Sequence, residues 1–452
     1  MTNSNNAIAA NSRSWPTGWD KLKIPDDRQE AHGALKVAAQ RTQVMIAAVR
    51  RTREVKGARR AERLSRRFLN SDTARLTALA AAYDRRRGSI IDADGAALDT
   101  IFAALPAVNP FKGSHGRLSA LPREKFDGSF RWVYRAKLVD HAVGLLVKYA
   151  LEALCTPEPT QFMSVGGRAG FERWLRTTLP GAALVLTTDI PSCFESLMRD
   201  AVISGLPLPA AVKKAVLFDP KDRAFFLDVA PRGLTPMSKE KVAMVSAHKR
   251  GIPQGTAPAS IVSEALIAPI IRAINDTSPD VFAASFGDNL IVVLRNAKDR
   301  TPVTDALTSS VRDTFGADVI GPLTSRTRVT SPRQGLSFCG RDYRLFRGKL
   351  RIELSPDRLN KFAVRTAVRI QDGLRSKDPN ALPAIRESIL GWVAQNATIS
   401  GAVFTAVELL LSLERTSPKG CGTPPDDDPD ETFGLGELLS AEDEEPPWVE
   451  SL

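Results

Sequence analysis

Apolar residues recur at intervals of three and four over residues 34–83, so the sequence predicts helices there. Residues 128–155 begin with a strand-like pattern and continue as an amphipathic helix. A last helical pattern covers residues 356–414 and is broken near Pro379 and Pro383. Helical segments therefore open and close the ordered part of the chain.

Short β-prone runs lie between these helical segments. Residues 181–188 form an apolar run that ends at Asp189, as expected of a buried strand. Residues 281–294 contain two apolar runs around a polar turn at 287–289, and residues 336–355 show a similar arrangement. Both segments are therefore predicted as hairpins. Helices combined with hairpins in this order indicate an α+β fold.

Charge is unevenly distributed along the chain. It has 62 Lys and Arg against 51 Asp and Glu, a net charge of +11. Eleven of the acids lie in residues 421–452, where no Lys or Arg occurs, which leaves 40 acids and a net charge of +22 for residues 1–420. A body this basic favours a polyanionic partner such as nucleic acid, with charge for solubility alone as the alternative. The Pro- and acid-rich segment 417–452 is predicted to be disordered.

The basic residues are densest between two of the predicted helices. Residues 50–67 contain nine Lys and Arg and two acids, Glu54 and Glu62. Such a run forms either a solvated helix face or a surface that contacts phosphates, and the sequence leaves both interpretations open.

Cysteine usage and hydropathy narrow the setting. The four cysteines are scattered without a paired spacing, so neither a disulfide framework nor a zinc site is predicted. The N-terminus is polar, and the apolar run 402–413 is interrupted by Glu408. We therefore expect a cytoplasmic protein without a membrane partner.

Three stretches carry the candidate chemistry. The first strand delivers Asp189 at its end, a Gly/Pro loop at 251–256 contains Gln254 and opens a helix, and the hairpin at 281–294 presents Asp288. Carboxylates at the ends of neighbouring strands can hold the two divalent cations used in phosphoryl transfer. The glycine-rich loop allows a nucleotide to approach its backbone closely. Asp288 alone would be ordinary turn chemistry.

Taken in order, these stretches resemble the motifs of reverse transcriptases, most closely the group II intron type. The matching stretches are LNSDTARLTALAAAYDRRRGSIIDADG at 69–95, KFDGSFRWVYRAKLVDHAV at 125–143, LVLTTDIPSCF at 184–194, GIPQG at 251–255, FGDN at 286–289 and SFCGRDYRL at 337–345. Each motif is weak alone, but six in the same order are specific. The resemblance covers roughly residues 15–415.

The resemblance implies a right-hand polymerase. Its expected parts are a basic helical N-terminal extension at 1–110, fingers and palm at 111–355, a helical thumb at 356–416 and the acidic tail at 417–452. The expected substrates are deoxynucleotides, an RNA template and a DNA or RNA primer. The sequence does not indicate an oligomeric state.

The resemblance also assigns residues to roles. It implies that Asp189 and Asp288 bind two Mg²⁺ or Mn²⁺ ions, with the Ile190 carbonyl as an auxiliary ligand. The residues that it implies for nucleotide binding are Lys125, Arg131, Phe194, Gln254 and Gly255. An aromatic ring five positions after the first Asp clashes with a 2′-hydroxyl, so Phe194 favours deoxynucleotides, although Phe is also an ordinary core residue.

One departure from the family pattern concerns the catalytic turn. Asn289 stands where the family has a second Asp. An amide keeps a carbonyl ligand but removes a negative charge, which weakens cation binding. Asn289 is therefore expected to assist catalysis rather than to hold a metal ion by charge.

The sequence supports one main function and several alternatives. The main prediction is an RNA-directed DNA polymerase, a nucleotidyltransferase recruited by its host, with phage defence as a hypothesis by analogy. The alternatives are a catalytically weak RNA-binding maturase or chaperone, a template-independent polymerase and an RNA-synthesising polymerase.

Overall fold

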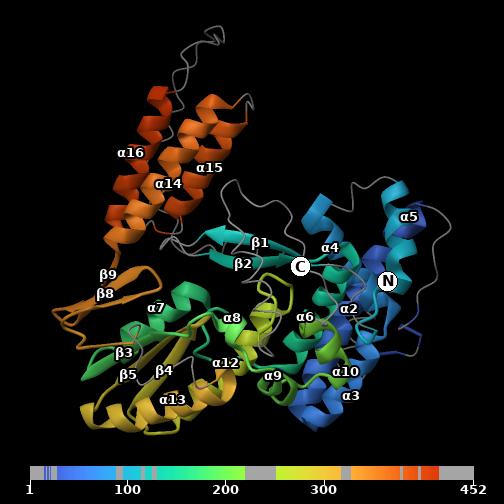
Figure 1. Ribbon diagram of the computed structural model, residues 1–452, viewed down its shortest axis with the longest axis horizontal. Helices are drawn as coiled ribbons and strands as arrows, with labels where there is room; N and C mark the ends of the chain where they lie inside the picture. The colour runs from blue at the N-terminus through green and yellow to red at the C-terminus, as the bar shows by residue number, and fades with distance from the viewer. Residues whose placement is uncertain are drawn as a thin grey trace, which may run out of the picture. The chain divides into compact units, whose positions relative to one another are not determined.

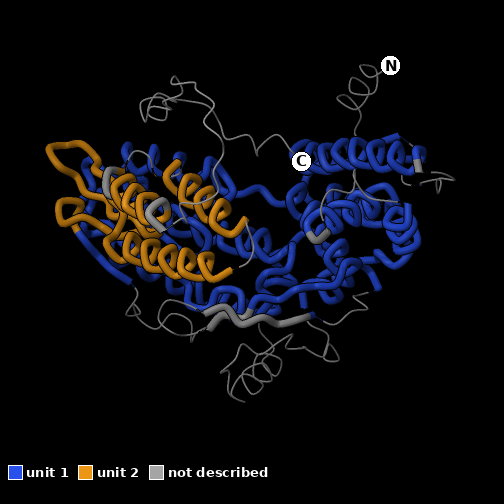
Figure 2. The backbone as a smooth tube through the Cα atoms, turned by 90° about the horizontal axis from the view of Figure 1, so that it is seen from above, with its two compact units in different colours: residues 1–330 blue, residues 331–452 orange. Residues whose placement is uncertain are grey.

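The computed structural model describes residues 15–16, 18–19, 21, 28–87, 95–112, 118–124, 130–218, 251–316, 327–376, 380–394, 396 and 399–416. Lys125, the turn at 92–94 and the tail at 417–452, for which predictions were made, lie outside these residues. The chain divides into two compact units, residues 1–330 and 331–452 (Figure 2). We describe each unit by itself.

The first unit begins with the helices that the apolar periodicity predicts (Figure 1). They are α2 (Arg28–Lys56), α3 (Ala58–Leu69), α4 (Asp72–Arg87), α5 (Gly95–Ala104) and the short 3₁₀ turn η2 (Leu105–Ala107). Gly57 separates α2 from α3 with a φ of 81°, a conformation that glycine adopts without steric cost. The predicted helical segment at 34–83 is therefore confirmed, with breaks at Gly57 and at 70–71.

A two-stranded antiparallel sheet follows. β1 (Ser119–Glu124) pairs with β2 (Phe130–Arg135), and the helix α6 (Leu138–Leu154) comes next. This order confirms the strand-to-helix pattern at 128–155. Pro122 lies in β1 opposite Trp132, a position open to proline because a two-stranded sheet consists of edge strands only.

The central sheet of the first unit has the strand order β4-β5-β3-β6. Its strands are β3 (Leu184–Asp189), β4 (Val281–Phe286), β5 (Asn289–Leu294) and β6 (Arg328–Thr330), and every pairing is antiparallel. Helix α12 (Ala259–Asn275) packs on β4 and on α13 (Arg300–Phe315) (Figure 1). The middle residues of β3 and β5 are buried, as their continuous apolar runs predict.

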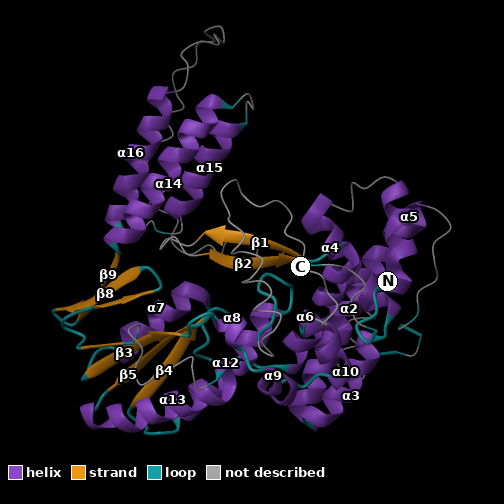
Figure 3. Ribbon diagram, in the orientation of Figure 1, coloured by secondary structure: helices purple, strands orange, loops and turns teal. Residues whose placement is uncertain are grey.

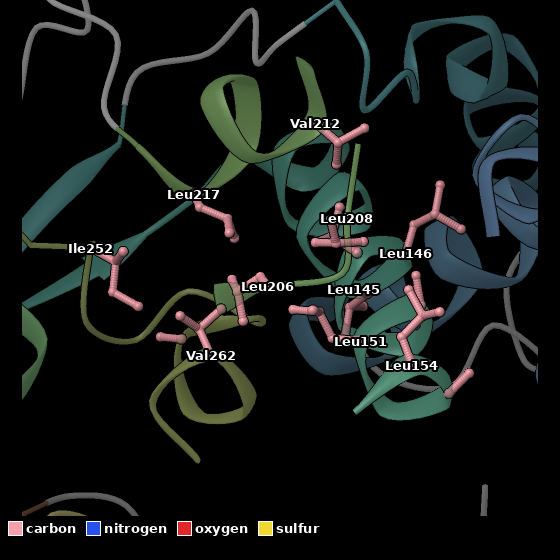
Figure 4. Packing of buried hydrophobic residues seen from close by; sticks show 14 of the residues in the cluster. Leu145, Leu146, Leu151, Leu154, Leu206, Leu208, Val212, Leu217, Ile252 and Val262 are labelled. Carbon is pink, nitrogen blue, oxygen red and sulfur yellow. The ribbon is translucent and has the colours of Figure 1, made fainter. Parts of the chain in front are cut away.

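Shorter helices complete the first unit around this sheet. They are α7 (Gly167–Thr178), α8 (Cys193–Ser196), α9 (Arg199–Gly205), α10 (Ala210–Val212), the π turn η3 (Lys213–Leu217) and the 3₁₀ turn η4 (Ala297–Asp299). Their leucines and those of α6 form one apolar core with Ile252 and Val262, as Figure 4 shows. The core reaches from the N-terminal helices to the sheet, so both belong to one folded body.

The second unit joins a small sheet to a helical bundle (Figure 3). Its elements are β7 (Leu336–Phe338), β8 (Arg341–Phe346), β9 (Lys349–Leu354), α14 (Pro356–Arg375), α15 (Ala381–Ala394) and α16 (Ser400–Thr416). Ser355 caps α14 by accepting the Arg358 backbone N–H, and Pro356 occupies the first helical position. The rings of Phe362 and Trp392 stack 3.7 Å apart between α14 and α15.

The structure confirms an α+β fold with antiparallel sheets. The functional boundaries at 110, 355 and 416 stay predictions, and so does the right-hand arrangement. Within the described residues, no helix combines the length and the apolar character that crossing a membrane requires.

Candidate functional site

The hairpin of β4 and β5 closes in a two-residue turn, Gly287-Asp288. Gly287 has a φ of +63°, which a type II′ hairpin turn requires at its first position. A Cβ atom at this position would also come within 3.1 Å of the Met163 sulfur. The turn is therefore specified by glycine, and Asp288 stands at its second position.

Asn289 is hydrogen-bonded to its neighbour. Its Nδ2 atom donates to Oδ1 of Asp288 at 3.2 Å and lies 3.5 Å from the Phe286 carbonyl oxygen. An aspartate at 289 has no N–H to donate and would place a second negative charge beside Asp288. The amide thus orients the Asp288 carboxylate without a bound cation.

Asp189 lies directly across from this turn. Its Cα pairs with that of Asn289 in the β3–β5 register, and the Ile190 backbone N–H donates to the Asp288 carbonyl oxygen at 3.0 Å. Directly opposed residues of an antiparallel pair project from the same face of the sheet, with Cβ atoms about 5 Å apart. The structure therefore brings together the four predicted residues Asp189, Ile190, Asp288 and Asn289.

The chain turns sharply after Asp189. Ser192 adopts a left-handed conformation, with φ 49° and ψ 43°, immediately before the short helix α8. For a residue other than glycine this conformation costs about 1 kcal/mol or more. Phe194 follows in α8 and is half-buried against the apolar core.

The loop at 251–256 is fastened on two sides. On one side the Ile252 N–H donates to the Phe194 carbonyl oxygen at 2.8 Å. On the other side the Gln254 carbonyl oxygen accepts the Tyr134 N–H of β2 at 2.7 Å. Gly255, with φ +90°, allows this approach, because a Cβ there would lie 2.7 Å from Cγ1 of Val133. The loop therefore bridges α8 and β2.

This bridge relates the remaining predicted residues to one another. Arg131 lies in β2 opposite Arg123 of β1, three positions before Tyr134, which bonds to the Gln254 loop. The backbones that carry Arg131, Phe194, Gln254 and Gly255 therefore belong to one connected region. Lys125 is outside the described residues, so the structure does not test its place in that region.

A segment that sequence reasoning missed holds the hairpin from its open edge. Ser285 of β4 donates its N–H to the Thr160 carbonyl oxygen at 3.0 Å and accepts the Phe162 N–H at 2.9 Å. Between them, the fully buried Gln161 donates from Nε2 to the Glu264 carbonyl oxygen at 2.8 Å. These bonds cover the edge of β4 and tie it to α12, so they fix the strand that leads into the catalytic turn.

Glu264 is a second residue that the sequence analysis missed. It lies in the otherwise apolar helix α12, is only 4% exposed, and accepts a hydrogen bond from the Ser164 hydroxyl at 3.3 Å. Burial raises the pKa of its carboxyl from 4.5 to about 7; the Ser164 bond opposes this shift and the charge of Asp288 adds to it. The signal in the sequence was a lone acid within an apolar helical run.

Cys193 reports the same environment. Burial raises the pKa of its thiol to about 12; a hydrogen bond with Ser263 opposes this shift, and the charges of Asp288 and Glu264 add to it. The thiol lies 3.3 Å from the Ser263 hydroxyl. A buried carboxyl and a neutral thiol therefore back the catalytic turn from the core side, so negative charge concentrates at Asp288 and Asp189.

We expect Glu264→Gln to stabilise the chain at pH 8 and to leave its stability unchanged at pH 4. The folded carboxyl has its pKa raised from 4.5 to about 7, so stability is fully present below pH 4.5 and is lost as the pH rises through 7. The loss amounts to about 3 kcal/mol, and glutamine avoids it because it does not ionise. Urea unfolding at both pH values measures the difference.

Asp276→Asn is a matched control for this prediction. Asp276 follows the same helix and is exposed. Its substitution should leave the difference in stability between the two pH values as in the wild type. Equal pH dependence of wild type and Glu264→Gln would contradict a buried, ionisable Glu264.

The donor set at the end of the sheet suits a hard divalent cation. Mg²⁺ takes one or two carboxylates, keeps several waters and accepts substrate phosphates, so Asp189, Asp288 and the Ile190 carbonyl fit it. Over the described ranges, no group of three or more His, Cys, Asp or Glu side chains is arranged to hold a metal ion. A cation at this site would therefore depend on the substrate for its remaining ligands.

Comparisons with known proteins give little further guidance. No protein-family model matches the chain, and no curated protein matches it. A partly similar solved structure is telomerase from Candida albicans in complex with the TWJ fragment of telomeric RNA, at 12% identity and a TM-score of 0.34. The match covers 67% of this chain and 60% of that chain. A likeness of this degree carries no argument about fold or activity, so the function is argued from the site.

Proposed function

We propose that this protein is an RNA-directed DNA polymerase that adds deoxynucleotides to a primer 3′-hydroxyl. The observation that carries the proposal is the pairing of Asp189 with Asn289 across β3 and β5, closed by the bond from Ile190 to Asp288. Two motifs 99 positions apart in the sequence thereby present their carboxylates at one end of one sheet. The order of the sequence motifs supports the same assignment.

In the proposed reaction, the primer hydroxyl attacks the α-phosphate of the nucleotide and pyrophosphate leaves. Divalent cations bound at Asp189 and Asp288 supply charge neutralisation and lower the pKa of the attacking hydroxyl. The chain's own contribution is to orient these carboxylates: Asn289 holds the Asp288 oxygen, and the β3–β5 pairing fixes the backbone of Asp189. Such preorganisation avoids rearrangement during the reaction.

The nucleotide is expected between the catalytic turn and β2. The loop at 251–256 is bonded to α8 and to β2, so Gln254 and Phe194 are held near each other by backbone hydrogen bonds. We assign the sugar to Phe194, the base and sugar edge to Gln254, and the triphosphate to Arg131 and Lys125. The basic charge of residues 1–420 favours a nucleic-acid template, and the choice of RNA rests on the sequence resemblance.

A binding module is the second candidate function. The observation that favours it is Asn289, which leaves the turn with one carboxylate where a pair would bind cations more tightly. On this view the frame binds RNA as a maturase or chaperone with little chemistry. Template-independent synthesis, RNA synthesis and a role in phage defence remain alternatives of the proposal, and primer extension with the template or each nucleotide class omitted separates the first two.

We expect Asn289→Asp to increase the apparent affinity for Mg²⁺ about tenfold, because charge count tunes such sites. The substitution replaces the donor to Asp288 with a second carboxylate, so it should also slow extension at very low cation concentration. Extension rates of both proteins over a range of Mg²⁺ and Mn²⁺ concentrations test the prediction.

Asn296→Asp provides the control, since it adds the same charge near the opposite end of β5. It should leave the Mg²⁺ dependence unchanged. If neither the wild type nor Asn289→Asp extends any primer, while both bind RNA tightly, the polymerase proposal fails and the binding module replaces it.

A further inference from the structure

The end of α2 and the length of α3 carry a group of exposed basic side chains, which we call the arginine face. It consists of Arg50, Arg51, Arg59, Arg60, Arg63 and Arg66, all of which are exposed. The sequence leaves open whether this run is a solvated surface or a phosphate contact. The packing of α3 and the fate of the neighbouring acids bear on that choice.

Helix α3 is strictly two-sided. At about 100° per residue, Arg59, Arg63 and Arg66 fall within about 60° of one another around the helix. The opposite side carries Ala61 and Phe68, which are 0% and 1% exposed in the core. Because the core fixes the rotation of the helix, the arginines are held outward as a set.

The neighbouring acids and rings do not neutralise this face. Glu54 pairs with Arg53 at 3.7 Å, and Glu62 acts electrostatically on Lys213 of η3. Arg67 lies 4.9 Å over the ring of Trp15 and is therefore not counted in the face. None of the six arginines forms an ion pair with another residue within the described ranges.

The surroundings of the face exclude a membrane and disfavour a protein partner. An amphipathic helix binds a bilayer by inserting its apolar side, but the apolar side of α3 is buried in the protein core. Protein interfaces have an apolar centre, whereas Val55 is the exposed large apolar residue of α2 and α3 near these arginines. A polyphosphate backbone needs only spaced cations. Arg59 to Arg66 spans about 10 Å, the length of about three phosphates in one strand.

We propose that the arginine face docks the phosphodiester backbone of duplex RNA at a surface separate from the catalytic turn. Helix α3 packs on α6, α6 on α12, and α12 on β4, so two helices stand between α3 and the sheet (Figure 1). This inference goes beyond the proposed polymerisation and does not require it. An RNA held there keeps its other segments at a high local concentration near the catalytic site.

The test measures binding of a fluorescently labelled, blunt 20-base-pair RNA duplex to the full chain without divalent cations. The test variant combines Arg59→Gln, Arg63→Gln and Arg66→Gln. The control variant removes the same charge from exposed positions on α7 and α13 by combining Arg173→Gln, Arg176→Gln and Arg312→Gln. A third variant keeps the charges by combining Arg59→Lys, Arg63→Lys and Arg66→Lys.

Each phosphate contact contributes about 0.9 to the slope of log affinity against log salt concentration. Between 50 and 300 mM KCl, we expect the test variant to lose about three from the magnitude of this slope and at least tenfold in affinity. The control and lysine variants should keep the wild-type slope. Equal losses in the test and control variants, or no duplex binding by the wild type, would overturn the proposal.

Two further probes identify the partner. A DNA duplex of the same sequence should show the same dependence on the arginines if the backbone is recognised, and dependence confined to DNA would overturn the choice of RNA. A synthetic peptide of residues 421–452, which carries eleven acids, tests the chain's own tail. If the arginines are needed for the peptide and not for RNA, the proposal is wrong. Primer extension on a short duplex, assayed separately, reports on the polymerase function.

Discussion

Asp288→Asn should reduce nucleotide incorporation at least 1,000-fold while the chain stays folded. The substitution keeps the size of the side chain and an oxygen that can accept the Asn289 amide. It removes the charge that binds the cations, and their stabilisation of the transition state is worth several kcal/mol. Because 1.36 kcal/mol corresponds to a tenfold change in rate, a loss of about 10³ or more follows.

Asp189→Asn should have the same effect, and the double variant should be no worse than either single one. Residues that act as a unit are not additive, since removing one already disables the site. Asp280→Asn, an exposed position immediately before β4 of the same hairpin, should stay within twofold of the wild type. Single-turnover primer extension measures all four proteins. Losses that add in the double variant would mean that the two carboxylates work at separate sites.

Phe194→Val should lower the preference for deoxynucleotides over ribonucleotides about 100-fold. Phe194 is half-buried in α8, its carbonyl is bonded to Ile252 of the Gln254 loop, and its ring is assigned to the sugar. A smaller side chain removes the clash with a 2′-hydroxyl, and steric discrimination of this kind is worth about 1–3 kcal/mol. Competition between the two nucleotide classes, measured as a ratio of kcat/KM, gives the result.

Phe194→Tyr keeps the ring and serves as the control, so it should retain the preference of the wild type. Phe194 also packs against the core, so the melting temperature of each variant must be measured alongside. A valine variant that is stably folded, active and unchanged in its preference would show that Phe194 is only a packing residue. The assignment of deoxynucleotides would then lose its support from this side chain.

Much of the fold follows from local patterns. The hairpin at 281–294 was predicted because apolar runs flank a glycine-containing turn, and its register then places Asn289 opposite Asp189. The helices at 34–83 and 356–414 followed from periodicity in the same way. These elements are decided by short-range sequence, so a single chain is enough to find them.

Other elements depend on partners that are distant in the sequence. β1 was not predicted because Pro122 argues against a strand, and its pairing with β2 decides the outcome. The three-residue β6 is too short to show a period and is defined by its pairing with β3. The edge contact of Gln161 with Ser285 joins residues 124 positions apart. Local propensity carries no information about such pairings.

The site divides along the same line. The residues at element ends, Asp189, Gln254 and Asp288, could be found from the sequence because their neighbours define a strand end, a loop and a turn. Glu264 could not be distinguished from an ordinary surface acid until the burial of α12 was known. The bond between Asn289 and Asp288 is also a finding of the structure, and it gives the departure from the family pattern a physical role.

The central claim is that Asp189 and Asp288 hold a cation together, and cleavage of the chain by bound iron tests it most directly. With Fe²⁺ and ascorbate replacing Mg²⁺, locally generated radicals cut the backbone next to the metal. We expect cuts near both residue 189 and residue 288, which disappear when Mg²⁺ is added and in the Asp288→Asn variant. Cuts at only one of these positions, or cuts elsewhere that Mg²⁺ also suppresses, would contradict a shared cation site.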